Sequence, residues 1–152
     1  MTASVDDLFD QLCLNWAREA DAVFHEAGTV APTLILLPRD AAKEEVPIRL
    51  DGLRGNLAER GPALVGELAS TAKGHDPAGL VFLAQLRIGS AGHADDSADD
   101  PVMVYVSLGT AQWRRALAFG VRRPLTGPAM LERLDTDPDV SMFSWLDALL
   151  AR

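Results

Sequence analysis

Cysteine is almost absent from this sequence of 152 residues, and its scarcity limits the fold classes that the chain can adopt. The single cysteine, Cys13, cannot form a disulfide within the chain, so the disulfide-rich folds of small secreted domains are excluded. Its neighbours Leu12 and Leu14 indicate an apolar helix. We therefore interpret the Cys13 thiol as structural and inert.

Long hydrophobic runs and a basic N-terminus are missing as well. The longest apolar runs, residues 33–37 and 80–84, span about five residues, far below the roughly 20 of a transmembrane helix. The N-terminus carries Asp6 and Asp7 in place of the basic residues and apolar stretch of a secretory signal. We therefore expect no membrane partner and a cytoplasmic location.

Positive charge is scarce, which bears on the partners that the chain can bind. There are 14 Lys and Arg residues against 22 Asp and Glu residues, which gives a formal net charge of −8. Binding to nucleic acid depends on clustered basic side chains that release counterions from the phosphate backbone. The charge balance therefore predicts no nucleic-acid partner.

Motifs that hold cofactors or build catalytic sites are missing too. The chain has neither the glycine-rich dinucleotide fingerprint nor the phosphate-binding loop with its Gly-Lys pair, and we expect no cofactor. His25 and Glu26 begin like a zinc-protease motif, but Thr29 stands where the second histidine belongs. His75 and Asp76 are candidates for an acid–base pair, although a turn is the interpretation that we favour.

What is present is the composition of a folded globule. Hydrophobic residues make up 48% of the chain and charged residues 24%, which is too apolar for a disordered protein. The length is close to the commonest domain size. We predict a single globular domain over residues 1–152.

Apolar spacing predicts the secondary structure. Steps of three and four residues indicate a long helix over residues 5–27, capped by Ser4 with Asp7 and closed by Gly28. A break at Gly61-Pro62 precedes a second helix that ends near Gly74, and Ser141 starts a short third one. Short apolar runs and alternation predict the strands, which are residues 33–37 in the sheet centre, 46–50 at an edge, 79–88, and a hairpin of 102–108 with 112–123.

The order of these elements predicts the α+β class. We expect a five-stranded, mainly antiparallel sheet packed with two long helices and a short C-terminal helix. Residues 89–101 are predicted to form a solvated loop, and residues 124–139 a loop with one helical turn at most.

Two groups of polar residues are candidates for a site. Hard divalent cations prefer several carboxylate oxygens, so one loop is a candidate metal site, although a solvated acidic loop is the interpretation that we favour. Its members are His93, Asp95, Asp96, Asp99 and Asp100. The second group flanks a predicted strand and would bind an anion or a partner, because arginine grips carboxylate or phosphate with two hydrogen bonds. Its members are Trp113, Arg114, Arg115, Arg122 and Arg123. The interpretation that we favour is that these arginines pair with the aspartates of residues 95–100 or with a partner chain.

The function that these observations favour is a non-catalytic binding or regulatory module of a bacterial cytosol, acting through protein–protein contacts. The strand over residues 112–123 is the expected surface for self-association into a homodimer. The alternative is a small enzyme or ligand-binding protein for an anionic small molecule, which would use Arg114, Arg115, Arg122 and Arg123. The sequence leaves open whether the chain is an enzyme.

Overall fold

The computed structural model of the protein is an antiparallel sheet with helices on both faces. It describes residues 5–40, 42–50, 55–87, 93–94, 100–109, 113–135 and 137–150. The sheet order is β2-β1-β4-β6-β7-β8, and the short strands β3 and β5 pair beside the end of β4. The elements are α1 (Val5–Ala27), β1 (Thr33–Pro38), β2 (Val46–Arg49), β3 (Gly55–Asn56), α2 (Leu57–His75), β4 (Pro77–Arg87), β5 (His93–Ala94), β6 (Val102–Leu108), β7 (Trp113–Arg122), β8 (Met130–Arg133) and the 3-10 helices η1 (Val140–Met142) and η2 (Ser144–Leu150).

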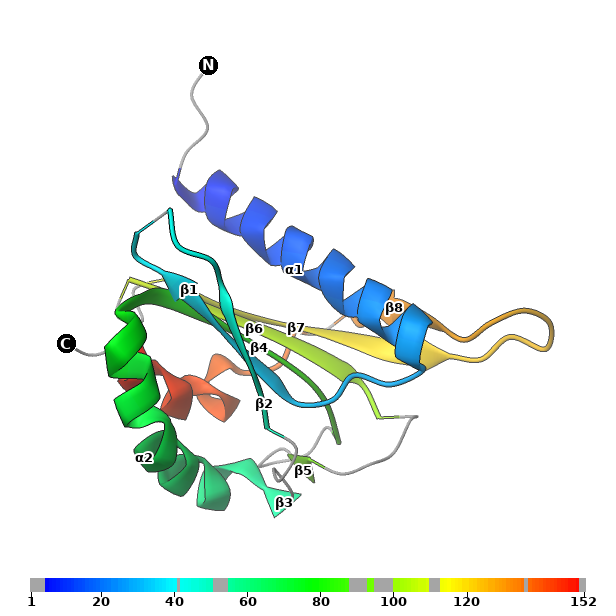
Figure 1. The fold of residues 1–152 in the computed structure, drawn as a ribbon. Coiled ribbons are helices and arrows are strands. Elements are labelled where there is room, and N and C mark those ends of the chain that lie inside the picture. The colour runs from blue at the N-terminus through cyan, green and yellow to red at the C-terminus, as the bar shows by residue number, and fades with distance from the viewer. Residues whose placement is uncertain are drawn as a thin grey trace.

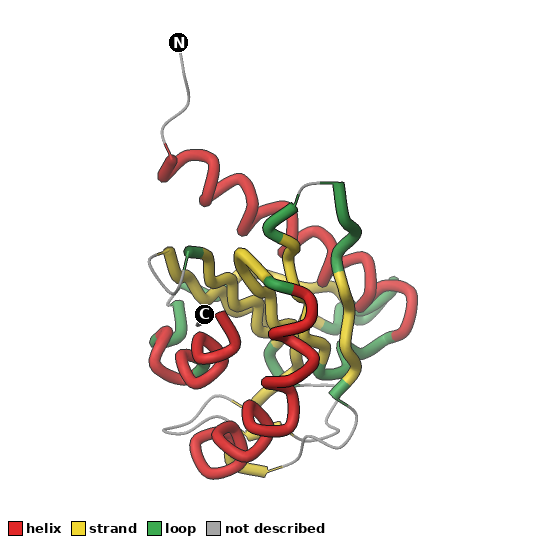
Figure 2. The backbone as a smooth tube through the Cα atoms, turned by 60° about the vertical axis from the view of Figure 1, so that its left-hand side comes forward, coloured by secondary structure: helices red, strands yellow, loops and turns green. Residues whose placement is uncertain are grey.

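The two faces of the sheet are covered by different elements. Helix α1 crosses one face, whereas α2 and the C-terminal 3-10 helices lie on the other (Figure 1). Figure 2 shows the strands held between these two layers. The predicted α+β class is confirmed. Within the described residues, no helix combines the length and the apolar character that crossing a membrane requires.

Helix α1 has the predicted bounds because its apolar face is continuous. Phe9, Cys13 and Phe24 are buried against the sheet. Gly28 ends the helix with φ +78°, and its amide donates to the carbonyl of Phe24 at 2.7 Å, as the glycine predicted. The predicted cap at Ser4 lies outside the described residues.

The strands that the sequence predicted from solid apolar runs form the interior of the sheet. β1 lies between β2 and β4, with Leu34 opposite Ile48 on one side and Phe82 on the other. β2 is an edge strand, as its proline predicted. β6 and β7 form the predicted hairpin, with Val104 opposite Leu117.

Helix α2 shows that the predicted break at Gly61-Pro62 was wrong. The helix runs through both residues and ends at His75, followed by Asp76 with φ +43°, so Gly74 does not close it. Gly61 is the contact point for the indole of Trp145, which would lie 2.5 Å from a Cβ at this position. Packing of the Trp145 side chain on the backbone of α2 therefore stabilises the first turns of the helix, where Gly61 and Pro62 lower the helix propensity.

The sheet has more strands than the five that were predicted. β8 falls in the segment predicted as loop, and the two-residue strand β5 falls in residues 89–101. β8 was missed because three of its four residues are exposed, which leaves little periodic pattern. The C-terminal helix is 3-10 rather than α, and Asp139 caps it in place of Ser141 by accepting a 2.9 Å hydrogen bond from the Ser141 amide.

Candidate functional site

Strand β7 carries the predicted anion- or partner-binding residues, and the structure divides them between two faces. Trp113, paired with Leu108 at the start of the strand, is half-buried, and its ring lies 6.0 Å from that of Phe9 in α1. The indole therefore packs in the cluster beneath α1.

Arg114 and Arg115 point to opposite faces of β7 because neighbours in a strand alternate. Arg114 Nη1 lies 3.3 Å from Asp147 Oδ2 in η2, and Arg115 Nη1 pairs with Asp10 Oδ1 in α1. The sequence leaves open that the aspartates of residues 95–100 or a partner chain pair with these arginines. The structure instead gives each one a carboxylate from the element that packs on its own face.

Arg122 and Arg123 lie at the far end of the same strand and are exposed. Eight residues separate Arg122 from Arg114, which corresponds to about 26 Å along an extended strand. The four arginines thus form two separate pairs. The structure therefore does not bring Arg114, Arg115 and Arg122 together at one anion site.

Tyr105, Asp147 and Arg114 form a polar cluster that the sequence did not reveal. The Tyr105 hydroxyl donates to Asp147 Oδ1 at 2.8 Å, and the Asp147 side chain is only 11% exposed. Burial, together with the neighbouring carboxylate, raises the pKa of Tyr105 far above its usual value. Since the cluster lies at the junction of η2 with β6 and β7, its role is to fasten the C-terminal segment to the sheet.

The predicted metal loop is only partly within the described residues. His93 pairs in register with Asn56 and Arg87 at the sheet end, and Asp95, Asp96 and Asp99 lie outside the described part of the chain. The Asp100 carbonyl accepts a 3.1 Å hydrogen bond from the buried side chain of Gln85. Among the residues that the structure describes, no group of three His, Cys, Asp or Glu side chains could hold a metal ion.

The other two histidines lie at separate places, since His25 is on α1 and His75 lines a small hollow of about 60 Å³ together with Lys43 and Glu44. His25 Nε2 is 3.4 Å from Asp21 on the same helix, and both side chains are about half exposed to solvent. Asp76 Oδ2 lies 3.5 Å from Arg39 Nε. The Asp76 carboxylate therefore lies beside the Arg39 guanidinium.

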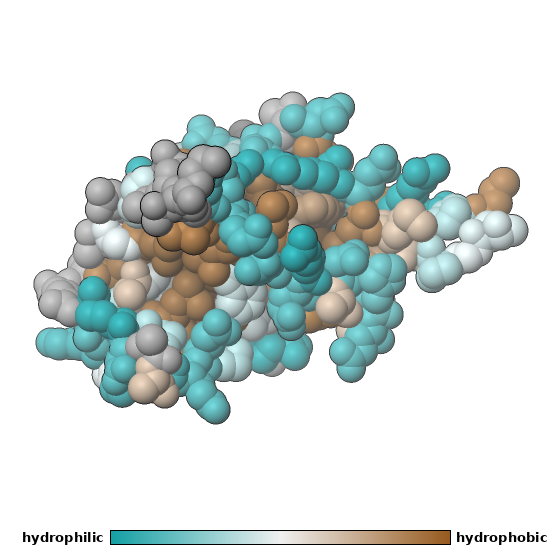
Figure 3. Space-filling model, turned by 90° about the horizontal axis from the view of Figure 1, so that it is seen from above, coloured by the Kyte–Doolittle hydropathy of each residue, from teal (hydrophilic) through white to brown (hydrophobic). Residues whose placement is uncertain are grey.

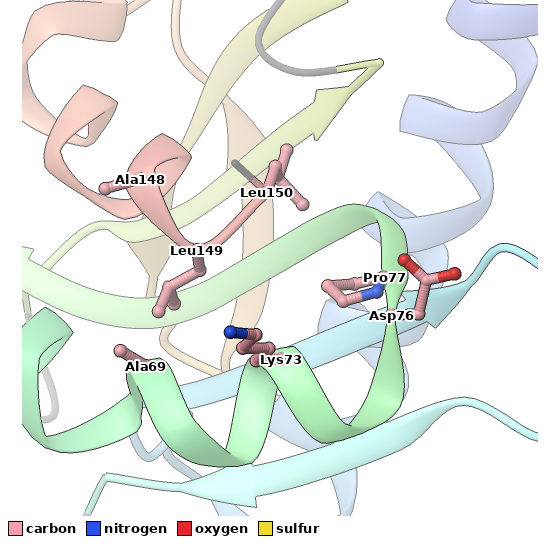
Figure 4. A pocket seen from close by; sticks show the side chains of 7 residues that line it. All are labelled: Ala69, Lys73, Asp76, Pro77, Ala148, Leu149 and Leu150. Carbon is pink, nitrogen blue, oxygen red and sulfur yellow. The ribbon is translucent and has the colours of Figure 1, made fainter. Parts of the chain in front are cut away.

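A cavity of about 640 Å³ lies between α2 and η2. Its walls are mostly apolar, with Leu149 and Leu150 on one side and Lys73 on the other. In Figure 4 the Lys73 amine is directed toward Leu149 and Ala69, whereas the Asp76 carboxylate points away from it. Among the described residues that line the cavity, Lys73 is the one cationic residue, and none is a histidine or a cysteine.

A second hollow, of about 240 Å³, lies between α1 and the last two strands. We call it the α1–β8 groove. Leu117, Phe119 and Leu131 form its apolar floor, and charged side chains stand at its rim. Its lining residues are Leu14, Ala17, Arg18 and Asp21 from α1 together with Leu117, Phe119, Leu131 and Arg133 from the strands. Leu14 is 43% exposed there, and nearby Met130 on β8 is 41% exposed.

The groove opens at the edge of the sheet, where backbone groups face outward. The Leu134 amide donates to the Ala118 carbonyl at 2.9 Å, and the β7–β8 register continues this pairing to Glu132. Because strands alternate, the amides and carbonyls of Leu131 and Arg133 point away from β7. β8 is the last strand of the sheet, so this edge can accept another strand.

Figure 3 views the molecule from the α1 side and shows hydrophobic atoms reaching the surface between hydrophilic ones.

No protein-family model, curated protein or solved structure matches the chain.

Proposed function

We propose that this protein is a non-catalytic binding module that acts through protein–protein contacts, and that the contact surface is the α1–β8 groove with the adjoining β8 edge. The observation that carries the proposal is the apolar floor of the groove, which opens directly beside outward-facing backbone groups. An apolar hollow next to a sheet edge is suited to an extended segment, because the edge supplies hydrogen bonds and the hollow receives a side chain.

The charges at the groove rim favour a protein segment over a small charged ligand. Arg133 is 3.4 Å from Asp137, and Asp21 is 3.4 Å from His25, so each has a local partner. Exposed pairs of this kind contribute little to stability and can rearrange at an interface rim. The floor between them offers apolar area without a convergent set of polar groups.

A second copy of the chain is the partner that we propose. Molecules that pair through a shared edge and groove can use the same patch on both subunits about a two-fold axis. The proposed dimer therefore needs no surface beyond the one already described. The position of β7 also agrees with the proposed dimer. Among the described residues, no strand pairs with Trp113–Leu117 on the side of β7 that faces away from β6.

Light scattering across a concentration series tests the proposal with a matched pair of variants on one helix. Leu14→Glu places a carboxylate at the groove, and we expect it to weaken self-association at least tenfold because an unpaired charge would be buried. Leu8→Glu is the control, since Leu8 is 61% exposed and is not part of the groove lining. A wild-type chain that stays monomeric at every concentration contradicts the proposal.

A further inference from the structure

We propose that the connection between β7 and β8, residues 123–129, is an exchange arm whose Leu125 docks into the α1–β8 groove of a second copy, which returns its own arm. This inference rests on the proposed function and names the occupant of the groove. The arm projects from the body of the protein (Figure 1), and hydrophobic atoms stand at its far end (Figure 3). Leu125 is fully exposed there.

The arm is built to hold its shape away from the sheet. Pro124 and Pro128 stand on either side of Leu125, and each fixes its own φ and lacks a backbone donor. Gly127 turns the chain with φ +96°, a conformation that disfavours other residues. An arm with restricted backbone freedom loses little entropy when it docks, which favours binding through a single apolar side chain.

Charge also matches the arm to helix α1 as a whole, whereas the groove lining itself carries Arg18 and Arg133 against Asp21. Residues 122–131 contain Arg122 and Arg123 and no Asp or Glu. Helix α1 contains six carboxylates against one arginine, Arg18. A cationic arm is therefore attracted toward the acidic helix of another copy, in a protein whose net charge of −8 would otherwise oppose association.

The geometry closes into a dimer rather than a chain of molecules. Six residues separate Phe119 on the groove floor from Leu125, so the tip lies at most about 20 Å from its own groove. A two-fold axis perpendicular to the arm brings each tip to the other groove at the same time. Both apolar surfaces are then covered, and no free arm remains to recruit a third copy.

Cysteine cross-linking between two different variants tests the exchange directly. Leu125→Cys mixed with Leu14→Cys should give a mixed disulfide on mild oxidation, in higher yield than either variant gives with itself. Leu125→Cys mixed with Leu8→Cys is the matched control and should give only background. Cys13 is 1% exposed, so the wild-type chain is expected to remain uncross-linked.

Two substitutions at the tip complete the test. Leu125→Asp should weaken self-association at least tenfold, whereas Leu125→Met should retain it, and neither should affect folding because the side chain is fully exposed. Should the protein dimerise while Leu125→Asp has no effect and the mixed disulfide is absent, arm exchange is overturned and the proposed function stands. A wild-type chain that is monomeric throughout overturns both.

Discussion

Tyr105 is the single tyrosine of the chain, so the ionisation of tyrosine in this protein reports on the environment of one residue. Its ring is buried, and its hydroxyl donates to Asp147 at 2.8 Å. Both circumstances favour the neutral phenol and raise the pKa of Tyr105 in the folded chain. In the unfolded chain the group should ionise near its ordinary pKa of about 10.

Ultraviolet titration of tyrosinate measures this difference. We expect the folded protein to show no tyrosinate signal at about pH 11, whereas the chain in urea is already ionised there. Because the unfolded chain releases this proton first, the stability that Tyr105 contributes is present below about pH 10 and falls as the pH rises further. A folded protein that titrates together with the unfolded one would show that Tyr105 is neither buried nor bonded to Asp147.

The reactivity of the Cys13 thiol also depends on the surroundings of a single residue. Burial raises the pKa of the Cys13 thiol to about 11, although the nearby Arg115 guanidinium acts in the opposite direction. Since the thiolate is the reactive form, we expect no reaction with a thiol reagent at about pH 8 until the protein is unfolded. Rapid labelling of the folded protein would contradict the packing of α1 on the sheet.

At the scale of the element, α2 contains two glycines that differ in their surroundings. A Cβ at Gly61 would lie 2.5 Å from the Trp145 indole, whereas a Cβ at Gly66 would have nothing within 4 Å. Alanine at either position gains about 1 kcal/mol of helix propensity. At Gly61 we expect overpacking, with a cost of about 1–3 kcal/mol, to outweigh that gain.

Urea denaturation of the two variants separates these contributions. Gly66→Ala should raise the midpoint and Gly61→Ala should lower it. Equal stabilisation of both variants would mean that Trp145 does not pack on the helix and that the account of the uninterrupted α2 is wrong.

Elements with strong internal patterns could be predicted from the sequence, and elements held by distant contacts could not. The three- and four-residue steps between Phe9, Leu12 and Trp16 indicate α1 because this spacing is a property of the helix itself, although the buried face also includes Cys13 and Phe24. The continuity of α2 through Pro62 depends on Trp145, more than eighty residues away in the chain. No local pattern contains that contact.

The candidate site was predictable only in part for the same reason. The sequence indicated the strand over residues 112–123 as a surface, and the groove floor does include Leu117 and Phe119 from it. The opposite wall, with Leu14 and Asp21, depends on α1 lying across the last strands of the sheet. Strand order decides that placement, and apolar runs do not encode which neighbours a strand chooses.

At the scale of the whole molecule, acidic and basic residues are concentrated in different elements. The chain is acidic overall and its first helix is strongly so, whereas the arm with Arg123 and the adjoining Arg122 of β7 has the opposite sign. In the dimer that we propose, this arrangement would orient two copies as they approach, because the arm of one would be attracted to the helix of the other. The acidic remainder would oppose other geometries of association.

Hydrogen exchange, compared between dilute and concentrated samples, tests most directly whether the α1–β8 groove and the β8 edge form the contact surface. We expect concentration to slow exchange at the outward-facing amides of Leu131 and Arg133, since pairing would bury them. The opposite edge strand β2, with Val46–Arg49, should be unchanged and serves as the internal control. Exchange at Leu131 and Arg133 that does not depend on concentration, or slowing confined to β2, would contradict the account.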